Sequence, residues 1–335
     1  MQKMILYNYP FKGCLFFVSF LILVAGCNTW LIDQRSSSGR MTVVKETRLT
    51  HNATDVYSIS WSNDGQKIVY SLLDKRVANI WLMNSDGTGS TRLTSVPFND
   101  YDPSLSPDDR KIVFFSDRAG NNDIWIMDRG GNNLQQLTTT PENDVHPSWS
   151  PDAKQIAFIS NRSGEWAIWL MDPDGKNQQQ ITRGGNGDWS TTWSPEGQEI
   201  AFASTRITEE NRDQIGLAKK GEEGLETFDP MCAMPKLYSH IWTVNVQTKE
   251  VKQLTRGRIH DWRPAWSPDG KYIAFVSDRT GNCDVWTMDR NGNNLQQLTR
   301  AHLYDGLPTW NPHKKEMAFV SNREGNFDIW LLKLK

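Results

Sequence analysis

The chain has 335 residues, of which 23% are charged and 38% are hydrophobic, so its composition excludes a protein with several membrane spans. The formal net charge of −2 excludes a broad basic surface for nucleic acid. Tryptophan is abundant, with 15 copies, and many of them recur at regular positions along the chain.

Residues 1–26 have the organisation of a bacterial lipoprotein signal peptide. Lys3 and Lys12 precede an apolar run over residues 15–23, and small residues then lead to Cys27. A cysteine directly after Ala-Gly resembles a lipobox, so Cys27 is expected to be the lipid-modified first residue of the mature protein. Acyl chains anchor a soluble domain because each buried CH₂ contributes about 0.8 kcal/mol. Asn28, in place of Asp, favours the outer membrane of the bacterial cell envelope and a periplasmic location.

Residues 27–42 are expected to form a lipid-anchored linker before a folded domain at residues 43–335. They include Ser36-Ser37-Ser38-Gly39, and serine and glycine make a chain flexible. Two other interpretations of the N-terminus remain open: an uncleaved anchor, and an ordinary secretory signal with an unrelated cysteine. The apolar run is short for a transmembrane helix, which favours a signal peptide.

The folded part of the chain repeats itself. A phrase similar to Trp-Ser-Pro-Asp-Gly begins at Trp61, Leu105, Trp149, Trp193, Trp266 and Trp310. Successive copies are 44 residues apart, except for an interval of 73 residues between Trp193 and Trp266. A period in this range is typical of propellers and solenoids. Residues that recur in every copy are interpreted as scaffold, and residues that break the repeat are candidates for function.

Each copy is predicted to form four short antiparallel strands. In the fifth copy the first strand ends at Trp266, and the next three are predicted at residues 272–276, 284–288 and 295–299. The Ser-Pro-Asp-Gly run gives a tight turn, and Gly-rich turns separate the other strands. Four such strands per repeat are typical of a propeller blade, so the fold class is an all-β, six-bladed β-propeller.

The sixth copy lacks a fourth strand, and the start of the domain supplies one. The chain ends at Lys335, within the third strand of this copy, while residues 45–50 resemble the fourth-strand phrase at residues 295–299. The N-terminal strand is therefore predicted to complete the last blade, which leaves no open edge in the ring.

A six-bladed ring closed in this way resembles the propeller of the TolB family, over about residues 43–335. The sequence departs from that family in two respects, because the α/β domain before the propeller is expected to be missing and a lipobox stands in its place. The resemblance implies a peptide or envelope-protein partner, such as a peptidoglycan-associated lipoprotein. It also implies a role related to the Tol–Pal system in envelope integrity or transport.

Two charged residues recur on the face of the predicted ring that holds the second-to-third turns and the connections between blades. We call this the upper face. An aspartate opens copies two to six, at Asp100, Asp144, Asp188, Asp261 and Asp305. An arginine follows the second strand of the same copies, at Arg118, Arg162, Arg206, Arg279 and Arg323. Their joint absence from the first copy indicates structural Asp–Arg pairs, and a carboxylate ring that binds a cation is the alternative.

The positions between the recurring Asp and Trp vary, and they are predicted to line the upper mouth of the central channel. Four copies place an aromatic residue first, at Tyr57, Tyr101, Trp189 and Trp262. The next position holds Ser58, Asp102, His146, Ser190, Arg263 and Leu307. Aromatic rings offer rigid contact area and polar groups fix orientation, so the four aromatics are predicted to bind a ligand together with Asp102, His146 and Arg263. Packing between inner strands is the alternative.

The long interval places an insertion of about residues 207–240 in the second-to-third turn of the fourth blade. Long loops on rigid scaffolds often carry function, although a neutral surface insertion explains the sequence equally well. Cys232 lies in the insertion and Cys283 in the equivalent turn of the next blade. A Cys232–Cys283 disulfide is therefore expected if the two Cα atoms come within roughly 7 Å.

The sequence contains no nucleophile elbow, no Gly-rich phosphate loop and no clustered metal-ligand spacing. Propeller-bearing peptidases carry a hydrolase domain, and none is expected here. The alternative enzyme is a metal-dependent polysaccharide lyase, similar to oligogalacturonate lyases, that would use channel histidines. The candidates are His51, His146, His260 and His302, but their different offsets from the Trp positions favour hydrogen-bonding histidines and no metal site.

The sequence therefore predicts a lipid-anchored, non-enzymatic binding module of the cell envelope. It is expected to be a monomer without a cofactor that presents its upper face to an envelope protein, a peptide or a glycan.

Overall fold

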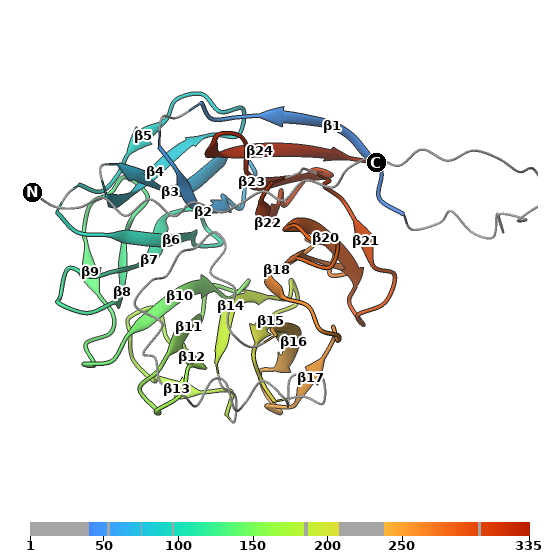
Figure 1. The fold of residues 1–335 in the computed structure, drawn as a ribbon. Helices are drawn as coiled ribbons and strands as arrows, with labels where there is room; N and C mark the ends of the chain where they lie inside the picture. Colours follow the sequence, from blue (N-terminus) through green and yellow to red (C-terminus); the bar gives the residue numbers. More distant parts are fainter. Residues whose placement is uncertain are drawn as a thin grey trace, which may run out of the picture. The chain divides into compact units, whose positions relative to one another are not determined.

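The computed structural model describes residues 40–51, 54–74, 76–95, 97–183, 187–207, 238–300 and 303–335. Over these ranges the chain forms six four-stranded antiparallel sheets arranged in a ring (Figure 1). Neighbouring first strands contact one another all the way round, from blade 1 to blade 6 and back to blade 1. The predicted all-β, six-bladed propeller is confirmed. No helix in the described ranges is long and apolar enough to cross a membrane.

The blades share one order of strands from the channel outward. The first strands are β2 (Val56–Trp61), β6 (Asp100–Leu105), β10 (Asp144–Trp149), β14 (Asp188–Trp193), β18 (Asp261–Trp266) and β22 (Asp305–Trp310). The second strands are β3 (Lys67–Asp74), β7 (Lys111–Ser116), β11 (Ile156–Ser160), β15 (Glu199–Ser204), β19 (Tyr272–Ser277) and β23 (Glu316–Glu324). The third strands are β4 (Val77–Asn84), β8 (Asp123–Asp128), β12 (Ala167–Met171), β16 (His240–Asn245), β20 (Asp284–Asp289) and β24 (Asn326–Leu334). The fourth strands are β5 (Thr91–Arg92), β9 (Gln135–Gln136), β13 (Gln179–Gln180), β17 (Val251–Gln253), β21 (Gln296–Gln297) and β1 (Val43–Arg48).

The turn after each first strand is fixed by its own side chains. In blade 1 the Ser62 hydroxyl donates to the Asp64 carboxylate at 2.6 Å and accepts the N–H of Lys67 at 2.8 Å. Gly65 has φ 65°, in the left-handed region that favours glycine. The same two serine bonds recur at Ser106, Ser150 and Ser267. The recurring phrase is therefore a turn on the face opposite to the recurring Asp, which we call the lower face.

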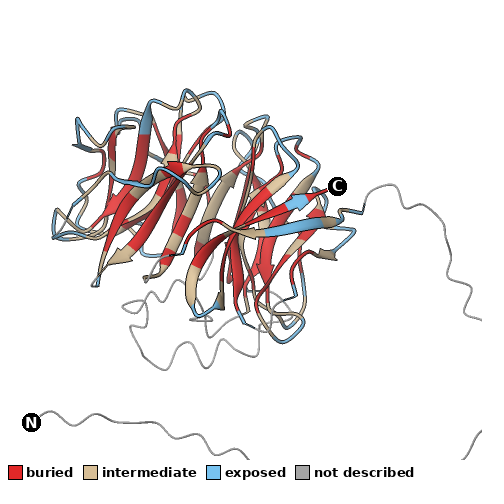
Figure 2. Cartoon of the chain, turned by 90° about the horizontal axis from the view of Figure 1, so that it is seen from above, coloured by how far each residue is buried: buried red, intermediate tan, exposed pale blue. Residues whose placement is uncertain are grey.

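The second strand of every blade forms the deepest part of the core. Its central residue is aromatic and fully buried in each copy: Tyr70, Phe114, Phe158, Phe202, Phe275 and Phe319. Buried residues run through the strands, and exposed residues gather at the loops (Figure 2).

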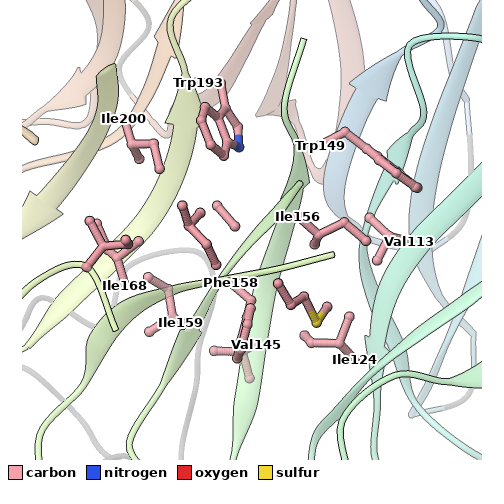
Figure 3. Packing of buried hydrophobic residues seen from close by; sticks show 14 of the residues in the cluster. Val113, Ile124, Val145, Trp149, Ile156, Phe158, Ile159, Ile168, Trp193 and Ile200 are labelled. Atoms are coloured by element: carbon pink, nitrogen blue, oxygen red, sulfur yellow. The ribbon is translucent and has the colours of Figure 1, made fainter. Parts of the chain in front are cut away.

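Hydrophobic side chains also join one blade to the next. Figure 3 shows a cluster in which Val113 of blade 2, Ile156 of blade 3 and Ile200 of blade 4 belong to one packed core. Three first-strand tryptophans add a polar link, because each indole N–H donates to a carbonyl of the preceding blade at 3.1–3.3 Å; they are Trp61, Trp193 and Trp310. The ring is therefore held by contacts between blades as much as by the sheets themselves.

The predicted closure of the ring by the N-terminal strand is confirmed. Strand β1 pairs antiparallel with β24 and completes blade 6, beside the red C-terminal strands in Figure 1. The Thr50 hydroxyl donates to Asp328 at 2.7 Å and accepts the N–H of Ile329 at 2.9 Å. Arg48 adds an ion pair to Asp328 at 2.6 Å. An equivalent threonine accepts the corresponding N–H in the other blades, at Thr94, Thr138, Thr182, Thr255 and Thr299.

The variant Thr50→Val is expected to lower the free energy of unfolding by about 1–3 kcal/mol, because a buried N–H and a buried carboxylate lose a partner. Urea denaturation measures the change. Thr94→Val is the matched control, since Thr94 accepts the N–H of Ile80 in the same way, but Asn79 stands at the position that Asp328 occupies in blade 6. An effect of Thr50→Val no larger than that of Thr94→Val would show that the hydroxyl–carboxylate bond contributes nothing to ring closure.

Candidate functional site

The third residue of every first strand lies at the central channel. These six residues form a ring that we call the inner ring: Ser58, Asp102, His146, Ser190, Arg263 and Leu307. In five blades the pairing register with the second strand shifts at this point, which makes a β-bulge. A bulge turns one side chain out of the regular alternation, and bulges are frequent beside functional sites.

Five members of the inner ring adopt a left-handed backbone. Their φ angles are 46–56°, at Asp102, His146, Ser190, Arg263 and Leu307. Residues other than glycine accept this conformation at a cost on the order of 1–2 kcal/mol each. Five residues with this unfavourable backbone conformation therefore lie at one level of the channel, at the positions whose side chains line it.

A cavity of about 420 Å³ extends from the inner ring to the turns of the lower face, where it reaches the exposed residues Asn63 and Pro151. We call it the lower cavity. Its walls carry hydroxyl groups from all over the ring, including those of Ser60, Ser104, Ser148, Thr192 and Thr309. Prolines and tryptophans of the first strands and their turns complete the lining. The titratable side chains in the lining are those of Asp102, His146 and Arg263.

These three titratable side chains meet at the inner end of the lower cavity, and we call them the cross-channel cluster. Asp102 Oδ2 accepts a bond from Arg263 Nη1 at 3.4 Å and contacts His146 Nδ1. Asp102 belongs to blade 2, His146 to the adjacent blade 3 and Arg263 to blade 5, on the opposite side of the ring. The three polar residues predicted from sequence are thus brought together, below the upper mouth and across the channel.

The cross-channel cluster keeps Asp102 ionised. Burial alone would raise the pKa of this carboxyl, but the Arg263 guanidinium and His146 together hold the pKa well below its usual range. A carboxylate paired in this way is fixed in place, and its charge is balanced by Arg263. The end of the cavity is therefore an ordered polar surface on which the charges of Asp102 and Arg263 oppose each other.

The four predicted aromatic residues lie outside the lining of the lower cavity. Tyr57 and Tyr101 contact each other edge to face with ring centroids 6.0 Å apart, and Tyr101 also packs on Phe115. Burial, with smaller effects of Tyr57, Asp117 and Asp102, raises the pKa of Tyr101 to about 12. The structure places these rings between blades, so their role as ligand contacts stays a prediction.

The aromatic residues of blades 4 and 5 are placed in the same way. Trp189 packs against Trp166 with centroids 5.0 Å apart, and Trp262 packs against two hydrophobic clusters. All four side chains are half-buried, and the contact between Tyr57 and Tyr101 joins two inner strands. Ligand contact and packing therefore both stay interpretations of these four residues.

The recurring Asp and Arg residues form five ion pairs on the upper face. One pair joins Arg118 to Asp100. The other four have N–O distances of 2.6–2.8 Å: Arg162–Asp144, Arg206–Asp188, Arg279–Asp261 and Arg323–Asp305. Each guanidinium also lies 4.7–5.8 Å from the centroids of the second-strand Phe and third-strand Trp rings of its own blade. The aspartates are fully buried, so these pairs hold the blade scaffold.

The histidines named for a metal site do not converge in the structure. His146 is bound into the cross-channel cluster, His260 lies at the joint between blades 4 and 5, and His51 is exposed. Among the described residues no group of three or more His, Cys, Asp or Glu side chains could hold a metal ion. His302, Cys27 and Cys232 lie outside the described residues, as does most of the insertion, so the Cys232–Cys283 disulfide stays a prediction. Cys283 itself is buried.

Sequence reasoning missed two features of the site. The hydroxyl-rich wall of the lower cavity comes mainly from the fifth position of the first strands, where the sequence gives no sign of a binding surface. It also missed the buried Asp123 and Asp284, each at the start of a third strand. The signal for both aspartates was present, because the equivalent position holds Asn, Ala or His in three of the six copies.

Replacing Asp102 by Asn is expected to lower the free energy of unfolding by about 3 kcal/mol at pH 7, because Arg263 then keeps a buried charge without its carboxylate. The pKa of Asp102 is depressed, so its contribution is complete above the unfolded value of about 3.9 and is lost as the pH falls below it. Urea denaturation from pH 7 to pH 3 measures both effects. The variant should therefore lose part of the acid sensitivity of the parent.

The double variant Asp102→Asn/Arg263→Gln supplies the control, since it removes both charges. It should be more stable than the sum of the two single changes predicts. Strict additivity of the two changes would contradict an energetic link across the channel.

The comparisons with known proteins agree with this architecture. A family model described as the TolB beta propeller domain matches residues 44–227 and 234–335. The solved structure of TolB from Acinetobacter baumannii is similar, with a TM-score of 0.61 and 20% identity over 78% of this chain and 59% of that chain. This chain thus spans only 59% of the length of that protein. No curated protein gives a significant sequence match.

Two further structures have the same fold. A putative TolB from Agrobacterium tumefaciens has a TM-score of 0.62 and 19% identity, covering 85% of this chain and 92% of that one. An oligogalacturonate lyase in complex with manganese has a TM-score of 0.53 and 15% identity, covering 87% and 93%. Identities this low establish a common fold and no common activity. The family model, however, matches most of the chain, and the chain therefore belongs to the family of TolB β-propeller domains.

Proposed function

We propose that this protein is a lipid-anchored binding module of the bacterial cell envelope, without enzymatic activity, and that it receives an extended segment of an envelope protein in the lower cavity. The observation that carries the proposal is the cavity itself. It is walled by the first strands of the ring, reaches the lower face and ends at the ordered cross-channel cluster. Membership of the TolB propeller family supports an envelope location.

The chemistry of the cavity favours a peptide with few charges. Serine and threonine hydroxyls can donate to or accept from the backbone of an extended chain, and proline and tryptophan provide rigid apolar contacts. The charges of Asp102 and Arg263 balance each other, so a charged group buried beside them would lack a full partner. A glycan, which is also rich in hydroxyl groups, is the competing ligand.

The predicted lipid anchor fits this proposal. Strand β1 begins at the lower face, because it runs antiparallel to β24. A linker of residues 28–42 reaches at most roughly 3.5 Å per residue from a modified Cys27. The lower cavity would then be available to partners close to the membrane surface, and the upper face, which the sequence favoured for binding, would be secondary.

The variant Ser104→Trp is expected to abolish binding of the envelope partner, because an indole at this position fills the lower cavity. The measurement is co-purification from envelope extract, followed by titration with the purified partner. Ser163→Trp is the matched control, since Ser163 is exposed on the upper face, and it should bind as the parent does. Both variants are first compared with the parent in thermal unfolding.

Two outcomes would contradict the cavity proposal. Retention of the partner by Ser104→Trp, with loss in Trp189→Ala/Trp262→Ala, would return the site to the upper mouth. Cleavage of oligogalacturonate by the parent after addition of manganese would replace the binding module by a lyase.

The anchor is tested separately with Cys27→Ser. The parent is expected to incorporate a labelled fatty acid and to sediment with membranes, because Cys27 is the expected acylation site. The variant should lose the label. Equal labelling of parent and variant, or a parent without label in the soluble fraction, would remove the lipoprotein assignment.

A further inference from the structure

Each joint between neighbouring blades places a residue at or near the start of a third strand beside the first residue of the next blade, which is the recurring Asp in five of the six joints. The geometry is fixed by the backbone: the N–H of Asp144 donates to the carbonyl of Asn122 at 2.7 Å, and the N–H of Asp305 donates to that of Cys283 at 2.9 Å. Asn122 and Cys283 directly precede the third strands β8 and β20. Asp123 therefore lies beside Asp144, and Asp284 beside Asp305.

The residue at this position differs from joint to joint. It is Asn79, Asp123, Ala167, His240, Asp284 and Asp328 in blades 1 to 6. Only in blades 2 and 5 does an aspartate meet a second aspartate, because Asp328 faces Val56 of blade 1. The joints between blades 2 and 3 and between blades 5 and 6 therefore each contain two carboxyl groups, all of them at most 1% exposed. We call these two joints the acidic joints.

One oxygen at each acidic joint lacks a hydrogen-bond donor. Asp144 Oδ2 is bound by Arg162 at 2.6 Å and Asp305 Oδ2 by Arg323 at 2.7 Å. The other oxygen of each, Oδ1, is buried without a partner among the described residues. A buried acceptor without a donor is unfavourable, so these two positions require an explanation.

Two of the joints without a facing carboxyl pair show a contrast, whereas at the joint between blades 1 and 2 Asp100 Oδ2 is also buried without a partner among the described residues, beside Asn79. Asp188 uses both oxygens, since Oδ1 accepts from Ser204 and Oδ2 from Thr182 and Arg206. Asp261 has both oxygens within 3.1 Å of Arg279. The unpartnered oxygen is therefore a property of particular joints and not of the Asp–Arg pair itself.

The facing carboxyls of the acidic joints are poorly placed to ionise. Burial raises the pKa of Asp123 to about 6, and the neighbouring Asp144 adds to this effect, against the bonds from Thr138 and Gln136 and the charge of Arg162. Burial also raises the pKa of Asp284, with Asp305 adding to the effect, against bonds from Thr280, Gln297 and Thr299. Burial raises the pKa of Asp305 as well, against the charge of Arg323, so the two carboxyls of that joint compete for one proton. Arg162 and Arg323 are the cations at the two joints; each already binds the partner aspartate, and Arg323 is also paired with Glu46.

We propose that Asp123 and Asp284 each hold a proton that they donate to the unpartnered oxygen of Asp144 and Asp305, so that both acidic joints are tightened by mild acid and loosened when the proton is lost. Each joint then contains one carboxylic acid, one carboxylate and one arginine. Loss of the proton leaves two neighbouring buried carboxylates and only one guanidinium beside them.

The positions of the two acidic joints in the ring indicate how the loss of these protons would affect the lower cavity. They are diametrically opposite, so they divide the ring into two halves, blades 6, 1 and 2 and blades 3, 4 and 5. The cross-channel cluster bridges the halves, because Asp102 belongs to the first half and His146 and Arg263 to the second. Both halves line the lower cavity, so loosening both joints would widen it.

The direction of the pH effect follows from linkage. Because the folded pKa of Asp123 lies above the unfolded value of about 3.9, the folded state binds the proton first as the pH falls. Stability from these groups therefore increases from above pH 6 down to about pH 4. This is opposite to the effect of Asp102.

Hydrogen exchange by mass spectrometry at pH 7.5 and pH 5.0, corrected for the intrinsic rate, tests the proposal on the whole chain. The parent should exchange the amides of Asp144 and Asp305 at least tenfold more slowly at pH 5.0. Asp123→Asn/Asp284→Asn should be protected at both pH values, because an amide donates permanently. The amide of Asp188, which faces Ala167, serves as the internal control and should not change.

The double variant Asn79→Asp/Arg92→Gln provides a gain of function. Arg92 Nη2 donates to Asn79 Oδ1 at 2.8 Å and would otherwise hold the new carboxyl ionised, so it is removed as well. The double variant places a carboxyl beside Asp100, whose Oδ2 is buried without a partner among the described residues, and should create acid-dependent protection at the joint between blades 1 and 2. Parent protection that is independent of pH, or a pH response that survives in the Asn variants, would overturn the proposal. Neither result depends on ligand binding, so this experiment can fail without contradicting the proposed binding function.

Discussion

The structure depends on one constraint, which is that no blade can bury its surface alone. Each sheet packs on two neighbours, so an unpaired end would expose a hydrophobic face and a strand edge. Strand β1 removes that end by joining the first part of the domain to β24. Thr50 and Arg48 then make at Asp328 the kind of contacts that a fourth strand makes in the other blades. The side chains that line the channel keep their relative positions because the ring is closed.

The fold could be predicted from sequence because its determinants recur. Six copies of the turn phrase set the number of blades, and the likeness of residues 45–50 to a fourth strand located the closure. The site could be predicted only in part. Asp102, His146 and Arg263 were identified because they occupy the one position of the repeat at which the residue type changes between copies. Their convergence from different blades depends on the left-handed backbone at the bulge, which the local sequence does not predict. The aromatic residues one position earlier do not line the lower cavity.

The bulge thus separates scaffold from site. Residues before it belong to the upper face, where buried Asp–Arg pairs and their aromatic neighbours hold the blades together. Residues at the bulge and after it line the lower cavity. The joints between blades share one backbone geometry, yet the residue at the start of the third strand gives each joint its own electrostatics. A scaffold of six similar blades can therefore form a binding cavity and still have joints that differ in stability.

The most direct test of the central claim is photo-cross-linking in cells. A photoreactive phenylalanine analogue at Ser104 reports on the lower cavity, and one at Ser163 reports on the upper face. The account predicts that one envelope protein is cross-linked from Ser104 and not from Ser163, and that the attachment maps to an extended segment of that partner. Cross-links from Ser163 alone would contradict the account and would place the binding site on the upper face.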